Sequence, residues 1–215
     1  PEARAKAASA LKAAESMELD EADTRELIDA RLREAGWEAD TLNLRHSAGS
    51  RPEKGRNKAI AEWPCAGGRR ADYLLFRGLE AVAVVEAKRA SRNVPSVLDQ
   101  AEDYSRSLAQ DGWKATGGPW EGHLVPFAVS TNGRPYLAQL SQASGIWFRD
   151  LRRDTNLPRP LQGWYTPGGL GELLKADVGA AEKALDDFGF ELDFPLRYYQ
   201  KDAILAAEDA IRRGE

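Results

Sequence analysis

The stretch RRADYLLFRGLEAVAVVEAKR, residues 69–89, decides the fold, because it holds two apolar runs joined by a short connection. The runs 71–76 and 81–88 are rich in aliphatic, β-branched and aromatic residues and have the length of strands. The tetrapeptide Phe76-Arg77-Gly78-Leu79 fits a tight connection between them. We therefore predict an antiparallel hairpin at the centre of the domain.

This hairpin is expected to bring two carboxyl groups together. Glu86 and Lys88 lie two apart in a strand and therefore project from the same face. A turn centred near Gly78 and Leu79 makes Asp72 and Glu86 near neighbours across the strands, with Cβ atoms about 5 Å apart. Adjacent carboxylates repel each other unless a proton or a cation lies between them. Mg²⁺, a hard ion that prefers oxygen ligands, fits this position, and Lys88 can orient or polarise a water there.

A surface salt bridge on a strand is the alternative interpretation of Asp72, Glu86 and Lys88, because an Asp followed at a distance by Glu-x-Lys arises easily by chance. The flanking residues favour a functional site. Both runs are strongly apolar, so the charges interrupt buried strands instead of decorating a solvated face. Buried charges without partners are costly, and function is the usual reason to keep them.

The remaining pattern predicts a mixed α/β domain around this hairpin. A helix over about 20–35 has an apolar stripe and ends at Gly36. The pair Asn132-Gly133 signals a second hairpin, between 126–131 and 135–140. We also expect strands at 40–46, 59–63 and 145–152, and helices at 95–110, 168–187 and 196–213.

Gln100 and Tyr104 are four apart in the helix expected after the hairpin, so they share a helix face. In one interpretation Tyr104 is a core residue and Gln100 borders it. In the other, which the adjacent Asp, Glu and Lys favour, the two side chains hydrogen-bond a phosphate or a base near the metal.

Charge is unevenly distributed along a chain whose net charge is −4. Such a balance argues mildly against nucleic-acid binding by surface charge alone. Residues 45–58, however, hold five basic residues against one acidic residue, and 172–193 hold seven acidic against two basic. Two solvated surfaces are the simpler explanation. Alternatively, the basic segment, a Gly- and Pro-containing loop, contacts DNA phosphates without reading bases, through Arg51, Lys54, Arg56 and Lys58.

Several classes of protein and site are excluded. The lone Cys65 rules out a disulfide framework and any multi-cysteine metal site, and it indicates a reducing compartment. No apolar run approaches the roughly 18 residues of a membrane span, and the first residues do not form a signal peptide. We therefore expect a cytoplasmic protein without membrane partners. No G-x-x-x-x-G-K-[ST] phosphate-binding loop occurs in the chain.

Several segments together resemble the N-terminal nuclease module of type I restriction endonuclease motor subunits. They are EADTRELIDARLREAGW (21–37), RRADYLLFRG (69–78), AVVEAKR (83–89), DQAEDYSRSL (99–108) and PFAVSTNGR (126–134). This resemblance implies a restriction-endonuclease-like PD-(D/E)xK nuclease, with a mixed central sheet flanked by helices and a short helical C-terminal extension. The residue before the Asp is Ala71 and not Pro, a departure that the group tolerates.

The resemblance also implies roles for the residues of the hairpin. Asp72 and Glu86 would bind Mg²⁺, together with the carbonyl of Ala87. Lys88 would be the catalytic lysine.

Three further catalytic residues follow from the same resemblance. Gln100 and Tyr104 match the accessory Gln-x-x-x-Tyr motif of this nuclease group. Glu21 would be the acidic residue that the first helix often supplies, and Glu26 is the competing choice.

The tail LRYYQKDAILAAEDAI (196–211) resembles the segment that opens the first RecA-like domain of superfamily 2 helicases, with Gln200 as the adenine-reading glutamine. A terminal amphipathic helix is the alternative. Because the phosphate-binding loop is missing, we expect an N-terminal fragment without ATPase activity of its own, and ATP as a cofactor of the full-length protein only. The expected parts are a helical arm (1–19), the nuclease domain (20–153), a linker with acidic helices (154–195) and the start of a truncated helicase domain (196–215).

The expected function is Mg²⁺-dependent hydrolysis of duplex DNA within a type I restriction-modification complex, with methyltransferase and specificity subunits as partners. Two alternatives stay open. One is a catalytically silent nuclease fold that serves as a DNA-binding or docking module of a helicase. The other is a nuclease of a different defence or repair system.

Overall fold

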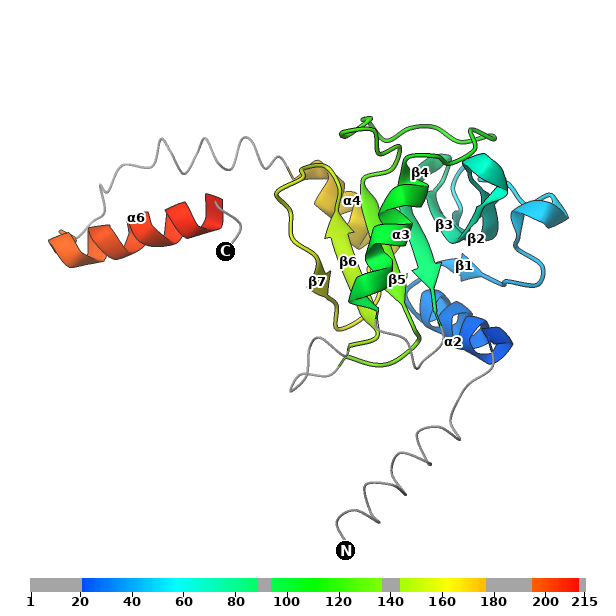
Figure 1. The fold of residues 1–215 in the computed structure, drawn as a ribbon, viewed down its shortest axis with the longest axis horizontal. Coiled ribbons are helices and arrows are strands. Elements are labelled where there is room, and N and C mark those ends of the chain that lie inside the picture. The colour runs from blue at the N-terminus through cyan, green and yellow to red at the C-terminus, as the bar shows by residue number, and fades with distance from the viewer. Residues whose placement is uncertain (1–20, 89–93, 137–143, 177–194, 213–215) are drawn as a thin grey trace, which may run out of the picture.

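A single mixed sheet with helices on both faces forms the body of the protein (Figure 1). The computed structural model describes residues 21–88, 94–136, 144–176 and 195–212. The predicted N-terminal arm, 1–19, lies outside the described residues. Helices α2 (Glu21–Glu34) and α4 (Pro167–Lys175) contribute to one apolar core, and α3 (Pro95–Ser105) contributes to the other.

The sheet has seven strands in sequence order, β1-β2-β3-β4-β5-β6-β7. The β1–β2 and β4–β5 pairs are parallel, and the others are antiparallel, so the predicted mixed α/β architecture is confirmed. The strands are β1 (Glu38–Ala39), β2 (Asn57–Pro64), β3 (Arg70–Arg77), β4 (Glu80–Ala87), β5 (Phe127–Thr131), β6 (Ile146–Asp150) and β7 (Arg159–Pro160).

The central hairpin forms as predicted, with Gly78 and Leu79 between β3 and β4. Gly78 takes a φ of 59°, in the left-handed region that glycine adopts at little cost. A register shift between Leu75 and Phe76 precedes a regular pairing that ends with Tyr73 opposite Val85. The same register, continued by one residue, places Asp72 opposite Glu86.

Alternation along the strands builds a core on each side of the sheet. Ile28 and Leu32 of α2 pack with Tyr73 and Val85 in the first core. Leu98 and Ala101 of α3 pack in the second core, which also holds Leu74 and Val84 of the hairpin. Glu86 is two residues beyond Val84, so the strand directs it toward the α3 side.

The strand predicted at 40–46 is wrong. The Asp40 carboxylate accepts hydrogen bonds from the backbone N–H groups of Leu42 and Asn43, both at 3.0 Å. The Leu44 N–H donates to the Asp40 carbonyl. These bonds favour a turn over an extended chain, so β1 stops at Ala39.

The hairpin predicted across Asn132-Gly133 is also wrong. The antiparallel partner of β5 is β6, which begins only at Ile146. The Asn132 side chain accepts a hydrogen bond from the Arg134 N–H, and this local turn opens a longer connection. Of the predicted strand 135–140, residues 135 and 136 are not in a strand and 137–140 lie outside the described residues.

The segment after β6 adds to both sheet and core. Strand β7 pairs with β6, and Leu161 and Leu170 are buried in the first core.

Helix α6 (Tyr198–Arg212) matches the predicted terminal helix closely and stands apart from the sheet in Figure 1. Residues 177–187 of the predicted acidic helices lie outside the described residues. Within the described ranges, no helix is long and apolar enough to cross a bilayer.

Candidate metal-dependent nuclease site

Asp72 of β3 and Glu86 of β4 lie next to each other at the end of the hairpin that is remote from the Gly78 turn. Asp72 Oδ2 accepts a hydrogen bond of 2.8 Å from the Ala87 N–H, which ties the carboxylate to the neighbouring strand. The Glu86 side chain is only 4% exposed. Burial, together with the nearby Asp72 charge, raises the pKa of Glu86 to about 7. The structure therefore brings together the two carboxylates that the sequence predicts as neighbours.

Lys88 lies against Glu86, with Nζ 2.5 Å from Glu86 Oε1. Burial by itself would lower the pKa of Lys88, but the hydrogen bond to Glu86 and the charges of Glu86 and Asp72 outweigh burial and raise this pKa. Lys88 is therefore a charged ammonium at neutral pH. It can donate hydrogen bonds and stabilise negative charge, and it is not a free base.

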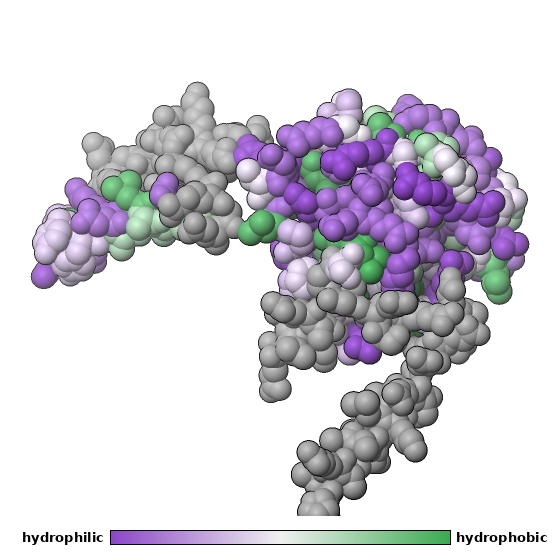
Figure 2. All heavy atoms as spheres, in the orientation of Figure 1, coloured by the Kyte–Doolittle hydropathy of each residue, from purple (hydrophilic) through white to green (hydrophobic). Residues whose placement is uncertain are grey.

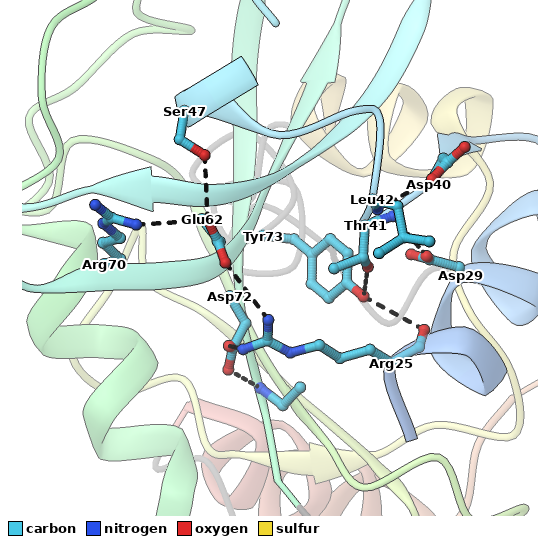
Figure 3. A network of polar contacts seen from close by, with 11 residues as sticks. Arg25, Asp29, Asp40, Thr41, Leu42, Ser47, Glu62, Arg70, Asp72 and Tyr73 are labelled. Atoms are coloured by element: carbon cyan, nitrogen blue, oxygen red, sulfur yellow. Dashed lines mark hydrogen bonds and ion pairs between the residues drawn. The ribbon is translucent and has the colours of Figure 1, made fainter. Parts of the chain in front are cut away.

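Arg25 of α2 reaches the same place from the other side of the sheet (Figure 3). Its guanidinium donates to Asp72 Oδ1 at 3.0 Å and lies 3.7 Å from Glu62 Oε1. Both oxygens of Asp72 thus have a donor, Arg25 on one and the Ala87 amide on the other. The Tyr73 hydroxyl of β3 donates to the Arg25 carbonyl at 3.5 Å and lies 2.8 Å from Thr41 Oγ1, which ties α2 to the sheet at Arg25.

Glu62 is a third carboxylate in this neighbourhood, and the β2–β3 register places it opposite Asp72. Its φ of 55° is left-handed, which is rare for a residue other than glycine. Ala61 packs in the first core and Trp63 in the second, although residues two apart in a regular strand share a face. The left-handed residue accounts for this switch of faces next to the site.

Gln100 and Tyr104 share a face of α3, as their spacing predicts, and their role as the accessory pair stays a prediction. Gln100 Nε2 donates to the Tyr104 hydroxyl at 2.7 Å. Tyr104 belongs to the second core and is only 7% exposed, as expected of a core residue. Its hydroxyl, however, is paired with Gln100, as the alternative interpretation of a polar pair near the site expects. Tyr104 is near enough to Lys88 to contribute, less than Glu86 and Asp72 do, to the raised pKa of that lysine.

The first helix brings a cation to Asp72. Glu21 begins α2, and its side chain lies outside the described atoms, while the competing Glu26 is exposed. The role of either residue stays a prediction. Arg25 and Glu62 were missed, yet both left a signal in the sequence. Arg25 closes the Glu-x-x-Thr-Arg segment, and Glu62 interrupts an apolar run as Glu86 does.

The chemistry of these side chains fits a magnesium ion. Glu86 Oε2 is buried and has no hydrogen-bond partner among the described residues, so the carboxylate keeps an oxygen available. Within the described chain, no group of three or more His, Cys, Asp or Glu side chains is placed to hold a metal. Mg²⁺ is usually bound by one or two protein carboxylates and keeps several waters, so Asp72 and Glu86 supply as many carboxylate ligands as Mg²⁺ sites commonly have. The Ala87 carbonyl as a third ligand stays a prediction.

The predicted DNA-binding residues of the basic loop do not border this site, although Ser47 of the loop donates a hydrogen bond to Glu62 at 3.3 Å (Figure 3). The loop precedes β2 at the end where Asn57 pairs with Arg77, while Asp72 lies near the other end of β3. Arg56 pairs with Glu38 and Glu53, and Lys58 pairs with Glu53.

The other two basic residues predicted in the loop differ in environment. Arg51 pairs with Asp111 at 2.8 Å, and Lys54 is exposed. Carboxylates therefore offset much of the positive charge of the loop. Gln200 is remote from the hairpin in sequence and lies in α6, where its side-chain oxygen accepts a hydrogen bond from the Arg197 N–H.

A mixed sheet that ends its central hairpin in two carboxylates and a lysine is the arrangement implied by the resemblance to restriction nucleases. The comparison with protein families agrees, because the family model described as the second domain of the type I restriction enzyme EcoKI endonuclease subunit matches residues 38–174. The chain therefore belongs to this family of type I restriction enzyme endonuclease subunits.

The chain is similar to two proteins of this kind. The type I restriction enzyme EcoKI endonuclease subunit of Escherichia coli (strain K12) is 38% identical over 229 residues, covering 93% of this chain. The match spans 20% of that subunit, so the chain corresponds to about a fifth of its relative. A fragment structure assigned to an HsdR subunit of a type I restriction enzyme from Vibrio vulnificus YJ016 is 26% identical. It covers 92% of this chain and 33% of that chain, with a TM-score of 0.45.

Proposed function

We propose that this chain is the Mg²⁺-dependent nuclease module, of PD-(D/E)xK type, of a type I restriction subunit, and that it hydrolyses phosphodiester bonds of duplex DNA. The observation that carries the proposal is the buried Glu86 carboxylate, which faces Asp72 and has an oxygen without a hydrogen-bond partner among the described residues. A metal held by Asp72 and Glu86 would supply Lewis acidity and a more acidic bound water.

The side chains of the chain itself have separable tasks. Asp72 is oriented by Arg25 and by the Ala87 amide, so its carboxylate needs little rearrangement to act as a ligand. Lys88, charged and held by Glu86, is placed to hydrogen-bond the attacking water or a phosphate oxygen. Tyr104 and Gln100 offer a hydroxyl and an amide beside Lys88 for the same phosphate.

The wider setting is proposed on the same basis. The partners are duplex DNA and the methyltransferase and specificity subunits of a restriction complex, in the cytoplasm. Family membership and the lone Cys65 support this setting. ATP is the expected cofactor of the motor in the longer protein, with Gln200 in the adenine site, and the basic loop remains a predicted DNA contact.

A plasmid-cleavage assay of the complete restriction complex tests the proposal. Asp72→Ala and Glu86→Ala each remove a metal ligand and should abolish cleavage. Lys88→Ala should reduce the cleavage rate by at least about 10²-fold, as loss of a positioned proton-transfer or charge-stabilising group does.

ATP hydrolysis by the same complexes is the control, because it belongs to the motor and should stay at the wild-type rate in all three variants. Cleavage by Lys88→Ala at the wild-type rate would remove the lysine from the mechanism. Retained cleavage by Asp72→Ala would overturn the assignment of the site.

A further inference from the structure

A short turn beside the site, residues 65–70, is held rigidly against the end of α3; we refer to it as the arginine turn. The Ala66 N–H donates to the Ser107 carbonyl at 2.8 Å, and the Ala109 N–H donates to the Pro64 carbonyl at 2.9 Å. Within the turn, the Cys65 N–H donates to the Arg69 carbonyl at 2.8 Å. Backbone bonds thus fix the turn to the segment that directly follows α3, the helix that carries Tyr104.

The turn presents two exposed cations at the edge of the site. Arg69 lies with its guanidinium 5.4 Å from the centre of the Tyr104 ring. The Arg70 side chain is 58% exposed and pairs with Glu62 at 3.4 Å. Arg70 is two residues before Asp72 in β3 and so lies on the same face of the strand (Figure 3 shows Arg70 with Glu62 and Asp72). Arg69, next to Tyr104, and Arg70 therefore lie beside the proposed metal ligands.

The backbone of the turn is open to close approach. Gly67 and Gly68 have φ values of 72° and 73°, and a Cβ at either position would meet nothing within 4 Å. A phosphate chain can therefore come nearer to this backbone than side chains would allow. Figure 2 shows that hydrophilic side chains cover most of the visible face of the sheet domain, which suits a polar ligand more than an apolar one.

The basic loop is a weaker candidate for the contact next to the bond that is cut. Its Arg51, Arg56 and Lys58 are each paired with a carboxylate, and Lys58 is buried. The basic residues of the loop also lie toward the opposite end of the β2–β3 pair from Asp72, since Lys58 pairs with Phe76 and donates a hydrogen bond to the Arg51 carbonyl. Pairing alone does not separate the two candidates, because Lys54 of the loop is exposed and Arg70 of the turn pairs with Glu62 at 3.4 Å. Position relative to Asp72 separates them.

We propose that the arginine turn binds the sugar–phosphate backbone of duplex DNA beside the scissile bond, with Arg69 and Arg70 as the phosphate ligands. This inference rests on the proposed nuclease function and names the contact that orients the substrate. Guanidinium groups bind phosphates through paired hydrogen bonds. A contact to phosphates carries no base information, so binding through the turn is independent of sequence.

Fluorescence anisotropy of a labelled DNA duplex tests the inference on the 215-residue chain in EDTA, so that neither metal binding nor cleavage affects the reading. Arg69→Gln with Arg70→Gln should weaken binding about tenfold or more. It should also lower the log–log salt slope by up to about 1.8, or 0.9 for each lost contact. The loss should be the same for duplexes of different sequence. Arg69→Lys with Arg70→Lys should restore most of the binding.

Lys114→Gln with Lys175→Gln is the matched control, because it removes the same charge from exposed positions outside the site and the loop. An equal loss in this control would mean that net charge alone is measured, and would overturn the proposal. A loss confined to Lys54→Gln with Arg56→Gln would assign the contact to the basic loop and overturn it too. Mn²⁺ binding is measured separately, without EDTA. A wild-type chain that binds DNA through the turn but binds no Mn²⁺ would contradict the proposed nuclease function and would still support the DNA contact.

Discussion

At the residue scale, Arg25 and Glu86 show how the site balances charge without a metal. Arg25 donates to Asp72 and approaches Glu62, while Lys88 neutralises one oxygen of Glu86. Buried like charges are costly unless cations lie between them. The two cations therefore hold the carboxylates in place, and a metal must share these ligands with them.

Arg25→Gln should tighten Mn²⁺ binding several-fold, because it removes a positive charge 3.0 Å from a ligand oxygen. The same change should lower the free energy of unfolding of the metal-free chain by about 1 kcal/mol, since a charged hydrogen bond is lost. Calorimetric titration and urea unfolding measure the two effects. Arg25→Lys, which keeps the charge, is the control, and weaker Mn²⁺ binding in Arg25→Gln would show that orientation of Asp72 outweighs repulsion.

His123 gives a pH dependence that is separate from the metal site. It is buried and hydrogen-bonded to Ser105, and burial together with the charges of Arg106 and Arg149 lowers its pKa, against opposing contributions from a hydrogen bond with the Glu102 backbone and from Asp103. Below about pH 6.5, His123 therefore binds a proton more readily in the unfolded chain than in the folded chain. The stabilising contribution is complete above about pH 6.5 and is lost as the pH falls below that value.

His123→Gln should therefore flatten the fall in stability between about pH 6.5 and 5. Urea unfolding at a series of pH values, with wild type alongside, measures this difference. Parallel curves for the two proteins would mean that His123 titrates equally in the folded and unfolded states.

At the element scale, the hairpin was predictable and the connections were not. The two apolar runs and the turn at Gly78 define the β3–β4 register, and so the meeting of Asp72 and Glu86. The turns at Asp40 and Asn132 depend on side-chain hydrogen bonds to the backbone, which compete with strand formation and which strand propensity ignores. The left-handed Glu62 left no backbone signal in the sequence, because its conformation depends on neighbouring strands.

Gly78→Ala tests whether the turn of the hairpin affects only the stability of the fold or also the geometry of the metal site. A Cβ at this position would meet only Gly55 N, at 3.7 Å, so the cost comes from the left-handed backbone. We expect a loss of about 1–2 kcal/mol in the free energy of unfolding. The Mn²⁺ affinity of the folded chain should not change, because the strand register is retained. A loss of metal binding without loss of stability would indicate that the turn contacts the site directly.

At the scale of the whole molecule, the sheet collects the site from distant parts of the sequence. Arg25 comes from the first helix, Asp72 and Glu86 from the central hairpin, and Tyr104 from the helix that follows. The sequence could predict the hairpin residues and the Gln100–Tyr104 pair because each set is local. It could not predict that Arg25 and the arginine turn border them, because those contacts depend on packing across the sheet. The predicted domain boundaries stay predictions.

Calorimetric titration of Mn²⁺ into this chain and its hairpin variants tests the central claim most directly. The account predicts saturable binding by the wild type and loss of binding in Asp72→Asn and Glu86→Gln. Binding should be equal or tighter in Lys88→Ala, which loses a like charge near the ion. Wild-type affinity in Asp72→Asn or Glu86→Gln, or no binding by the wild type, would contradict the assignment of these carboxylates as a metal site.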